Sequence, residues 1–138
     1  MARHAFSLTK NEAEIMEVMW KADRPLSRSE IIDLSPDRTW KASSFHILLN
    51  SMLQKGAVKV VGFVLNTKKY ARTFAPTVTA AEYIALQAKA SPSYKPERIP
   101  EILAALLPDA DDAILDELEN QIQQARQNRT EDQAEEAD

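Results

Sequence analysis

The sequence of 138 residues contains no cysteine, only two glycines and two histidines, and no long apolar run. Without cysteine the chain forms no disulfide and offers no thiolate to a metal. His4 and His46 lie far apart and have no obvious ligand partners, so we expect no metal site. No apolar run reaches the roughly 18 residues of a membrane span, and nothing resembles a signal peptide. We therefore expect a soluble, cytoplasmic protein that needs no cofactor.

These absences also argue against an enzyme. A catalytic nucleophile needs a base within reach, and metal catalysis needs clustered ligands. Two isolated histidines provide neither, and the chain has no glycine-rich loop that would cradle a phosphate. The acidic run of Asp109, Asp111 and Asp112 is typical of a helix N-terminus, where negative charge suits the helix dipole. We predict a binding protein.

Charge is unevenly divided along the chain. The net charge is −4, from 17 basic and 21 acidic residues. Residues 1–76 hold 12 Lys and Arg against 7 Asp and Glu, whereas residues 77–138 hold 5 against 14. This asymmetry predicts a cationic module joined to an acidic one.

Three helix starts carry the S/T-x-x-E capping box, in which a hydroxyl caps a backbone N–H and the glutamate reaches back to the cap residue. The boxes begin at Thr9, Ser27 and Thr79. Another helix, recognised by its apolar periodicity, stops at Gly56, a natural left-handed C-cap. Together with two further apolar stripes, these signals predict helices over 10–21, 28–34, 42–55, 80–90, 96–107 and 112–127.

The segment after Gly56 has the pattern of a β-hairpin. Residues 58–65 are rich in β-branched side chains, 66–69 are polar, and 70–74 form a second extended run before Pro76. Three helices followed by a hairpin is the element order of a winged helix-turn-helix. We therefore expect a mainly α fold with a small β-hairpin. It comprises an N-terminal winged helix-turn-helix over 1–76, a C-terminal helical dimerisation domain over 77–127, and a disordered acidic tail over 128–138.

The predicted helix over 42–55 has two distinct faces. One carries an apolar stripe that must be buried, namely Phe45, Leu48, Leu49, Met52 and Leu53. The other carries short hydrogen-bonding side chains and one isoleucine, which suit base edges and a thymine methyl in the major groove. Nearby lysines and arginines would position the module on phosphates. The predicted DNA-binding residues are Arg38, Lys41, Ser43, Ser44, His46, Ile47, Asn50, Lys68, Lys69 and Arg72.

An alternative function stays open because this helix has no arginine, and arginine to guanine is the commonest specific base contact. A winged-helix module that binds protein and not DNA would suit the weakly basic helix and an exposed Ile47. A protein-binding module would show no affinity for duplex DNA even at low salt, whereas a DNA-binding module would.

The apolar stripes of the last two helices must also be covered. We expect two copies to interlock, since a dimeric DNA-binding protein gains affinity from two half-sites related by twofold symmetry. A monomeric helical cap packed on the wing is the alternative. The predicted dimerisation residues are Ile99, Ile102, Leu103, Leu106, Leu107, Ile114, Leu115, Leu118 and Ile122.

Three segments resemble the penicillinase-repressor family, the BlaI and MecI type of bacterial transcription repressor. They are LTKNEAEIMEVMW (8–20), SSFHILLNSMLQKGAV (43–58) and NTKKYARTFAPTVTAAEY (66–83), and the similarity extends over residues 7–127. The resemblance implies a dimeric winged-helix protein. Such a protein binds a palindromic operator in double-stranded DNA through its N-terminal domain and dimerises through its C-terminal one.

The chain departs from the pattern of this family at several positions. Ser51 stands where members usually carry an arginine, and Ser43, Ser44, His46 and Ile47 are less cationic than the usual recognition residues. The paired cysteines of copper-responsive members are absent. Antibiotic-resistance members are cut by a protease between Asn and Phe, where this chain reads Ala-Leu at 105–106. A regulatory protease or sensor is thus a partner implied by the resemblance alone.

Overall fold

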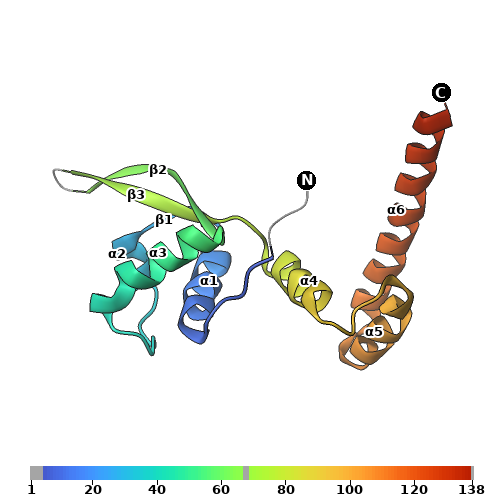
Figure 1. The fold of residues 1–138 in the computed structure, drawn as a ribbon, viewed down its shortest axis with the longest axis horizontal. Helices are drawn as coiled ribbons and strands as arrows, with labels where there is room; N and C mark the ends of the chain where they lie inside the picture. The colour runs from blue at the N-terminus through green and yellow to red at the C-terminus, as the bar shows by residue number, and fades with distance from the viewer. Residues whose placement is uncertain (1–4, 67–68, 138) are drawn as a thin grey trace. The chain divides into compact units, whose positions relative to one another are not determined.

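The first two helices of the computed structural model begin as their capping boxes predict. The structure describes residues 5–66 and 69–137 (Figure 1). The hydroxyls of Thr9 and Ser27 accept from the third helical N–H, while Glu12 and Glu30 accept from the N–H of the cap residue. A tighter 3-10 turn, Ala42–Ser44, leads into the third helix. These helices are α1 (Lys10–Ala22), α2 (Arg28–Asp33) and α3 (Phe45–Lys55).

A three-stranded antiparallel sheet follows α3 in the chain. The helix stops at Gly56, whose φ of 79° is left-handed and therefore favours glycine. The strands are β1 (Leu26–Ser27), β2 (Val58–Asn66) and β3 (Lys69–Pro76), in the order β1-β3-β2. The hairpin of β2 and β3 was predicted, whereas β1 was not. Two residues are too few to show an alternating pattern, and this strand is defined by its pairing with β3, Leu26 with Phe74 and Ser27 with Thr73.

The core of this part lies between the helices and the sheet. Phe45, Leu49 and Met52 of α3 are buried, and Leu48 and Leu53 are partly buried against them, as the apolar stripe predicts. α1 contributes Ile15, Met16 and Met19, and Phe74 enters from the sheet. The predicted fold class, mainly α with a small β-hairpin and a winged helix-turn-helix order, is therefore confirmed.

One charged pair lies at the edge of this core. Glu12 is only 1% exposed, and its Oε1 accepts from Lys55 Nζ at 2.5 Å and from the Thr9 N–H at 2.8 Å. Lys55 Nζ also donates to the carbonyl oxygen of Ser7 at 2.9 Å. Burial by itself raises the pKa of Glu12, but the hydrogen bonds from Lys55, Thr9 and Ser51 outweigh it, so this pKa lies below its ordinary value. Glu12 is therefore held as a buried carboxylate.

The next helix, α4 (Ala80–Ala90), is tied to the winged helix. The chain forms two compact units, Met1–Tyr94 and Lys95–Asp138, so α4 lies in the first one. The sequence analysis instead predicted that the first domain ends at residue 76, before α4. Tyr83 accounts for the difference, since its hydroxyl accepts from the Leu8 N–H at 2.9 Å and its ring stacks on Phe6 with centroids 5.5 Å apart. Gln87 adds a hydrogen bond to the Phe6 carbonyl oxygen at 2.7 Å.

Removing the Tyr83 hydroxyl should weaken this attachment. We expect Tyr83→Phe to lower the free energy of unfolding by about 1 kcal/mol, because the Leu8 N–H loses its acceptor while the ring stays. Tyr70→Phe is the matched control, since the Tyr70 side chain is 73% exposed on the wing. It should change stability by less than about 0.5 kcal/mol. Urea unfolding of both variants measures this, and equal effects would contradict the anchoring role of Tyr83.

The described part of the second unit contains helices and 3-10 turns and no strand. α5 (Ile99–Leu106) is flanked by 3-10 turns at Pro96–Arg98 and Leu107–Asp109, and α6 (Asp112–Ala137) follows. The carboxylate of Asp111 accepts from the Ile114 N–H at 2.9 Å, which fixes the start of α6. Pro108, in the second 3-10 turn, separates the two helices.

The prediction of a disordered tail over 128–138 is corrected by α6, which continues to Ala137. This part of the helix has no apolar stripe, and the prediction relied on that absence. The segment is nevertheless rich in Ala, Glu, Gln and Arg, which are good helix formers, and it extends a helix already nucleated. Side-chain pairs four residues apart add support, such as Gln124 with Asn128 at 3.0 Å and Gln127 with Glu131 at 3.4 Å.

Candidate nucleic-acid interface

The outer face of α3 is a narrow stripe of exposed side chains. Because Phe45, Leu49 and Met52 point into the core, the opposite side of the helix, with His46, Ile47 and Asn50, faces outward. This stripe comprises His46, Ile47 and Asn50 of α3 together with Ser43 in the 3-10 turn before the helix, and Ser44 is half-buried beside it. Ile47 is 63% exposed. The structure thus places these predicted residues close together on one exposed surface.

Ser51 does not belong to this stripe. It is half-buried and hydrogen-bonds to Glu12, and so it supports the Glu12–Lys55 pair. The serine that stands here in place of the usual arginine of the family is therefore not one of the residues of the exposed stripe.

Three arginines lie around α3, although the helix itself contains none. Each guanidinium sits over an aromatic ring, which limits the conformations of the long side chain. The distances from guanidinium carbon to ring centroid are 5.9 Å for Arg28 over Phe45, 5.4 Å for Arg38 over Trp40 and 5.4 Å for Arg72 over Phe74. The fold thus supplies from α2, the loop after it and β3 the cations that α3 lacks.

Two of these arginines meet the polar stripe directly. Arg28 and Arg72 line one small hollow together with His46 and Asn50. Arg28 was not among the predicted site residues. Its position next to the cap Ser27 gave no functional signal, and only the folded chain brings its guanidinium over Phe45 and beside His46 and Asn50. Two cations and two hydrogen-bonding side chains at one spot form a surface suited to phosphate and base edges.

The other predicted cations are more loosely placed. Lys41 and Lys69 are exposed, at the turn before α3 and at the start of β3. Lys68 lies outside the residues that the structure describes. Arg24 pairs with Glu30 at 2.7 Å, so its charge is partly neutralised. The Ser27 N–H and Arg24 hold the pKa of Glu30 below its ordinary value.

The predicted dimerisation residues form an uncovered apolar surface on the second unit. Eight of them are between 36% and 59% exposed in the single chain, and Leu118 is half-buried. α5 and α6 therefore do not cover each other's apolar stripes. Exposed apolar surface of this extent is typical of a contact with another protein surface. The exposed residues are Ile99, Ile102, Leu103, Leu106, Leu107, Ile114, Leu115 and Ile122.

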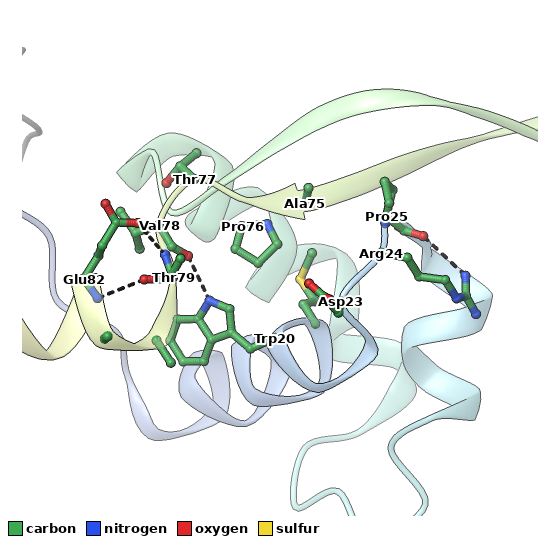
Figure 2. A pocket seen from close by; sticks show the side chains of 13 residues that line it. Trp20, Asp23, Arg24, Pro25, Ala75, Pro76, Thr77, Val78, Thr79 and Glu82 are labelled. Carbon is green, nitrogen blue, oxygen red and sulfur yellow. Dashed lines mark hydrogen bonds between the residues drawn. The ribbon is translucent and has the colours of Figure 1, made fainter. Parts of the chain in front are cut away.

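A hollow of about 590 Å³ lies where α1, the end of β3 and the start of α4 meet (Figure 2). The ring of Trp20 lines it, and the indole Nε1 donates to the Val78 carbonyl oxygen at 2.9 Å. Thr79 and Glu82 complete the capping box of α4. These polar groups of the lining thus serve the fold, and the hollow lies on a different set of elements from the stripe on α3.

Two other classes of site find no support in the described residues. Among residues 5–66 and 69–137, no group of His, Asp and Glu could hold a metal ion. Within the same ranges, no helix has the length and apolar character needed to cross a membrane.

Known proteins resemble the chain to different degrees. An uncharacterised 16.5 kDa protein from the ptsI 3′ region of Latilactobacillus sakei is 31% identical over 87 residues, which are 63% of this chain and 55% of that protein. The chain thus spans about half the length of this relative. The iron-containing ferric uptake regulator of Francisella tularensis has a TM-score of 0.42 at 14% identity, covering 64% of this chain and 80% of its own. A point mutant of MepR from a multidrug-resistant S. aureus clinical isolate has a TM-score of 0.44 at 8% identity, covering 89% of this chain and 80% of its own.

The model of the penicillinase repressor family matches residues 8–124. This match includes all of α1 to α5, both long strands and the first half of α6. It is this sequence match, and not the structural similarities, that identifies the family. The chain therefore belongs to the penicillinase repressor family, a family of transcription regulators and not of enzymes.

Proposed function

We propose that the chain is a homodimeric transcriptional repressor that acts in the cytoplasm and binds a palindromic operator. The observation that carries this proposal is the meeting of Arg28 and Arg72 with His46 and Asn50 at the exposed face of α3. In a winged helix-turn-helix, that face enters the major groove and the wing lies on the adjacent backbone. The stacked arginines contact phosphates, and the stripe reads base edges.

The second unit supports the dimeric form. An uncovered apolar surface on α5 and α6 fits a second copy of the same surface, because a twofold contact is self-complementary. Two copies then present two α3 helices to half-sites about one helical turn apart, or a multiple of it. The acidic character of residues 95–138 disfavours contact of this unit with DNA, so the first unit alone faces the duplex.

Charge-neutral variants of the two arginines test the interface. We expect Arg28→Gln and Arg72→Gln each to weaken binding of a mixed-sequence duplex about tenfold at low salt, and to reduce the salt slope by about one. Glutamine keeps much of the side-chain stem and removes the charge. Fluorescence anisotropy over a salt series measures both quantities.

Lys59→Gln provides the matched control for Arg72→Gln. Lys59 lies on the same hairpin, but it pairs with Ala75, whereas Arg72 pairs with Phe63. Side chains of neighbouring residues alternate between faces, so Lys59 is on the face opposite to Arg72. Its loss should change affinity much less. If Lys59→Gln and Arg72→Gln lose equal duplex affinity, only the net charge of the chain matters for binding. If the unaltered chain itself binds no duplex, the result favours a winged helix that binds protein.

A further inference from the structure

The wing carries large apolar side chains that the core does not cover. Phe63 and Leu65 are each 65% exposed, and Tyr70 is 73% exposed. The far part of the hairpin extends beyond α2 (Figure 1). Side chains of this size on a projecting hairpin are unusual for a surface that faces only water. We name Phe63, Leu65 and Tyr70 the wing strip.

The register of the sheet places the wing strip on one face. Leu65 pairs with Tyr70, and Phe63 pairs with Arg72, so each pair shares a face. Tyr70, Arg72 and Phe74 are two residues apart along β3, and they also lie on the same face. Phe74 is buried in the core, and Arg72 lines the hollow with His46 and Asn50. The wing strip therefore continues, along the hairpin, the surface that begins at the stripe on α3.

The charge of the hairpin identifies the kind of partner. Residues 57–76 contain three lysines and one arginine, and no aspartate or glutamate. Contact between two such wings would bring like charges together, which disfavours a second copy. A polyanion with apolar surface between its charges fits better. The minor groove of DNA has this chemistry, since deoxyribose walls lie between rows of phosphates, and phenylalanine and leucine are among the side chains inserted there.

We propose that the wing strip packs on deoxyribose and base edges in the minor groove beside the half-site that α3 reads. This inference rests on the proposed function and adds to it an apolar component of affinity. That component differs from phosphate contact in one measurable respect. Apolar contact releases no counterions, so it contributes affinity without contributing to the salt slope.

The experiment compares the full-length chain with Phe63→Ala/Leu65→Ala on a mixed-sequence duplex several helical turns long. We expect the double variant to bind at least about tenfold more weakly at every salt concentration, because two large side chains lose their buried contact. Its salt slope should equal that of the unaltered chain. Arg72→Gln should instead lower the slope. Because Phe63 and Leu65 are exposed, helical circular dichroism should be unchanged.

Val64→Ala is the matched control. Val64 stands between the two substituted residues, is 39% exposed and pairs with Ala71, so it lies on the other face of the hairpin. Its variant should bind as the unaltered chain does. Phe63→Met/Leu65→Met, which keeps apolar contact, should retain most of the affinity lost in the alanine variant.

Three results would overturn the inference, and they can be told apart. If the unaltered chain binds the duplex and the alanine variant binds equally well, the wing strip has no role while the proposed function stands. If the unaltered chain binds no duplex at low salt, both proposals fail. If light scattering shows that the alanine variant changes oligomeric state instead of duplex affinity, the partner of the strip is a second copy of the chain.

Discussion

Leu106→Glu should convert the protein to a monomer and lower its affinity for a palindromic duplex about 10²- to 10⁴-fold, the gain that linking two binding modules provides. Leu106 is 59% exposed at the end of α5 in the single chain. A carboxylate there would be buried without a partner in a twofold contact, which is costly. Sedimentation equilibrium gives the oligomeric state, and fluorescence anisotropy gives the affinity for the duplex.

Asn120→Glu is the control for this variant. It adds the same charge to the same unit, but Asn120 is exposed on the side of α6 opposite to the stripe of Ile114, Leu118 and Ile122. Added repulsion from DNA is therefore equal in the two variants. A dimer that persists in Leu106→Glu, or an equal loss of affinity in both variants, would contradict the proposed interface. Helical circular dichroism should be retained, because Leu106 is largely exposed within its own chain.

Lys55→Met should lower the free energy of unfolding at pH 7 by about 3 kcal/mol, because it leaves a buried carboxylate without its cation. Glu12 is 1% exposed, and Lys55 Nζ is its charged partner at 2.5 Å. Lys21→Met is the control, since Lys21 is exposed in the last turn of α1. It should change stability by less than about 0.5 kcal/mol.

The loss in Lys55→Met should also depend on pH. In the unaltered chain the pKa of Glu12 is below its ordinary value of 4.5, so its contribution to stability is present above that pH and is lost as pH falls through the lowered pKa. Without Lys55, burial dominates and the pKa of Glu12 should rise. The variant should then be least destabilised in acid, where Glu12 is neutral. Urea unfolding at neutral and acid pH tests this, and a loss that does not change with pH would exclude the buried pair as its cause.

Local signals in the sequence predicted most of the secondary structure. The capping boxes at Thr9, Ser27 and Thr79 are complete in the structure, and Gly56 has the left-handed backbone of a C-cap. These signals depend on residues three or four positions apart, and so a sequence contains them in full. The periodicity of α3 likewise predicted which side chains enter the core.

Features that depend on contacts between distant residues were missed. β1 exists only because Leu26 and Ser27 pair with β3. α4 joins the first unit through contacts of Tyr83 with Phe6 and Leu8. Arg28 reaches the stripe on α3 only in the folded chain, where its guanidinium lies over Phe45. The wing strip was visible as an apolar run, but its exposure was not. An apolar strand is normally expected to be buried, whereas Phe63 and Leu65 of this strand are each 65% exposed.

The proposed function requires that two copies of the chain bind one palindromic site in DNA. Its most direct test is selection of random duplex DNA by the purified protein at low salt, followed by sequencing of the recovered duplexes. We predict a palindrome whose half-sites are about one helical turn apart or a multiple of it. Failure to enrich any sequence, while light scattering shows a dimer, would contradict this claim and favour a winged helix that binds protein.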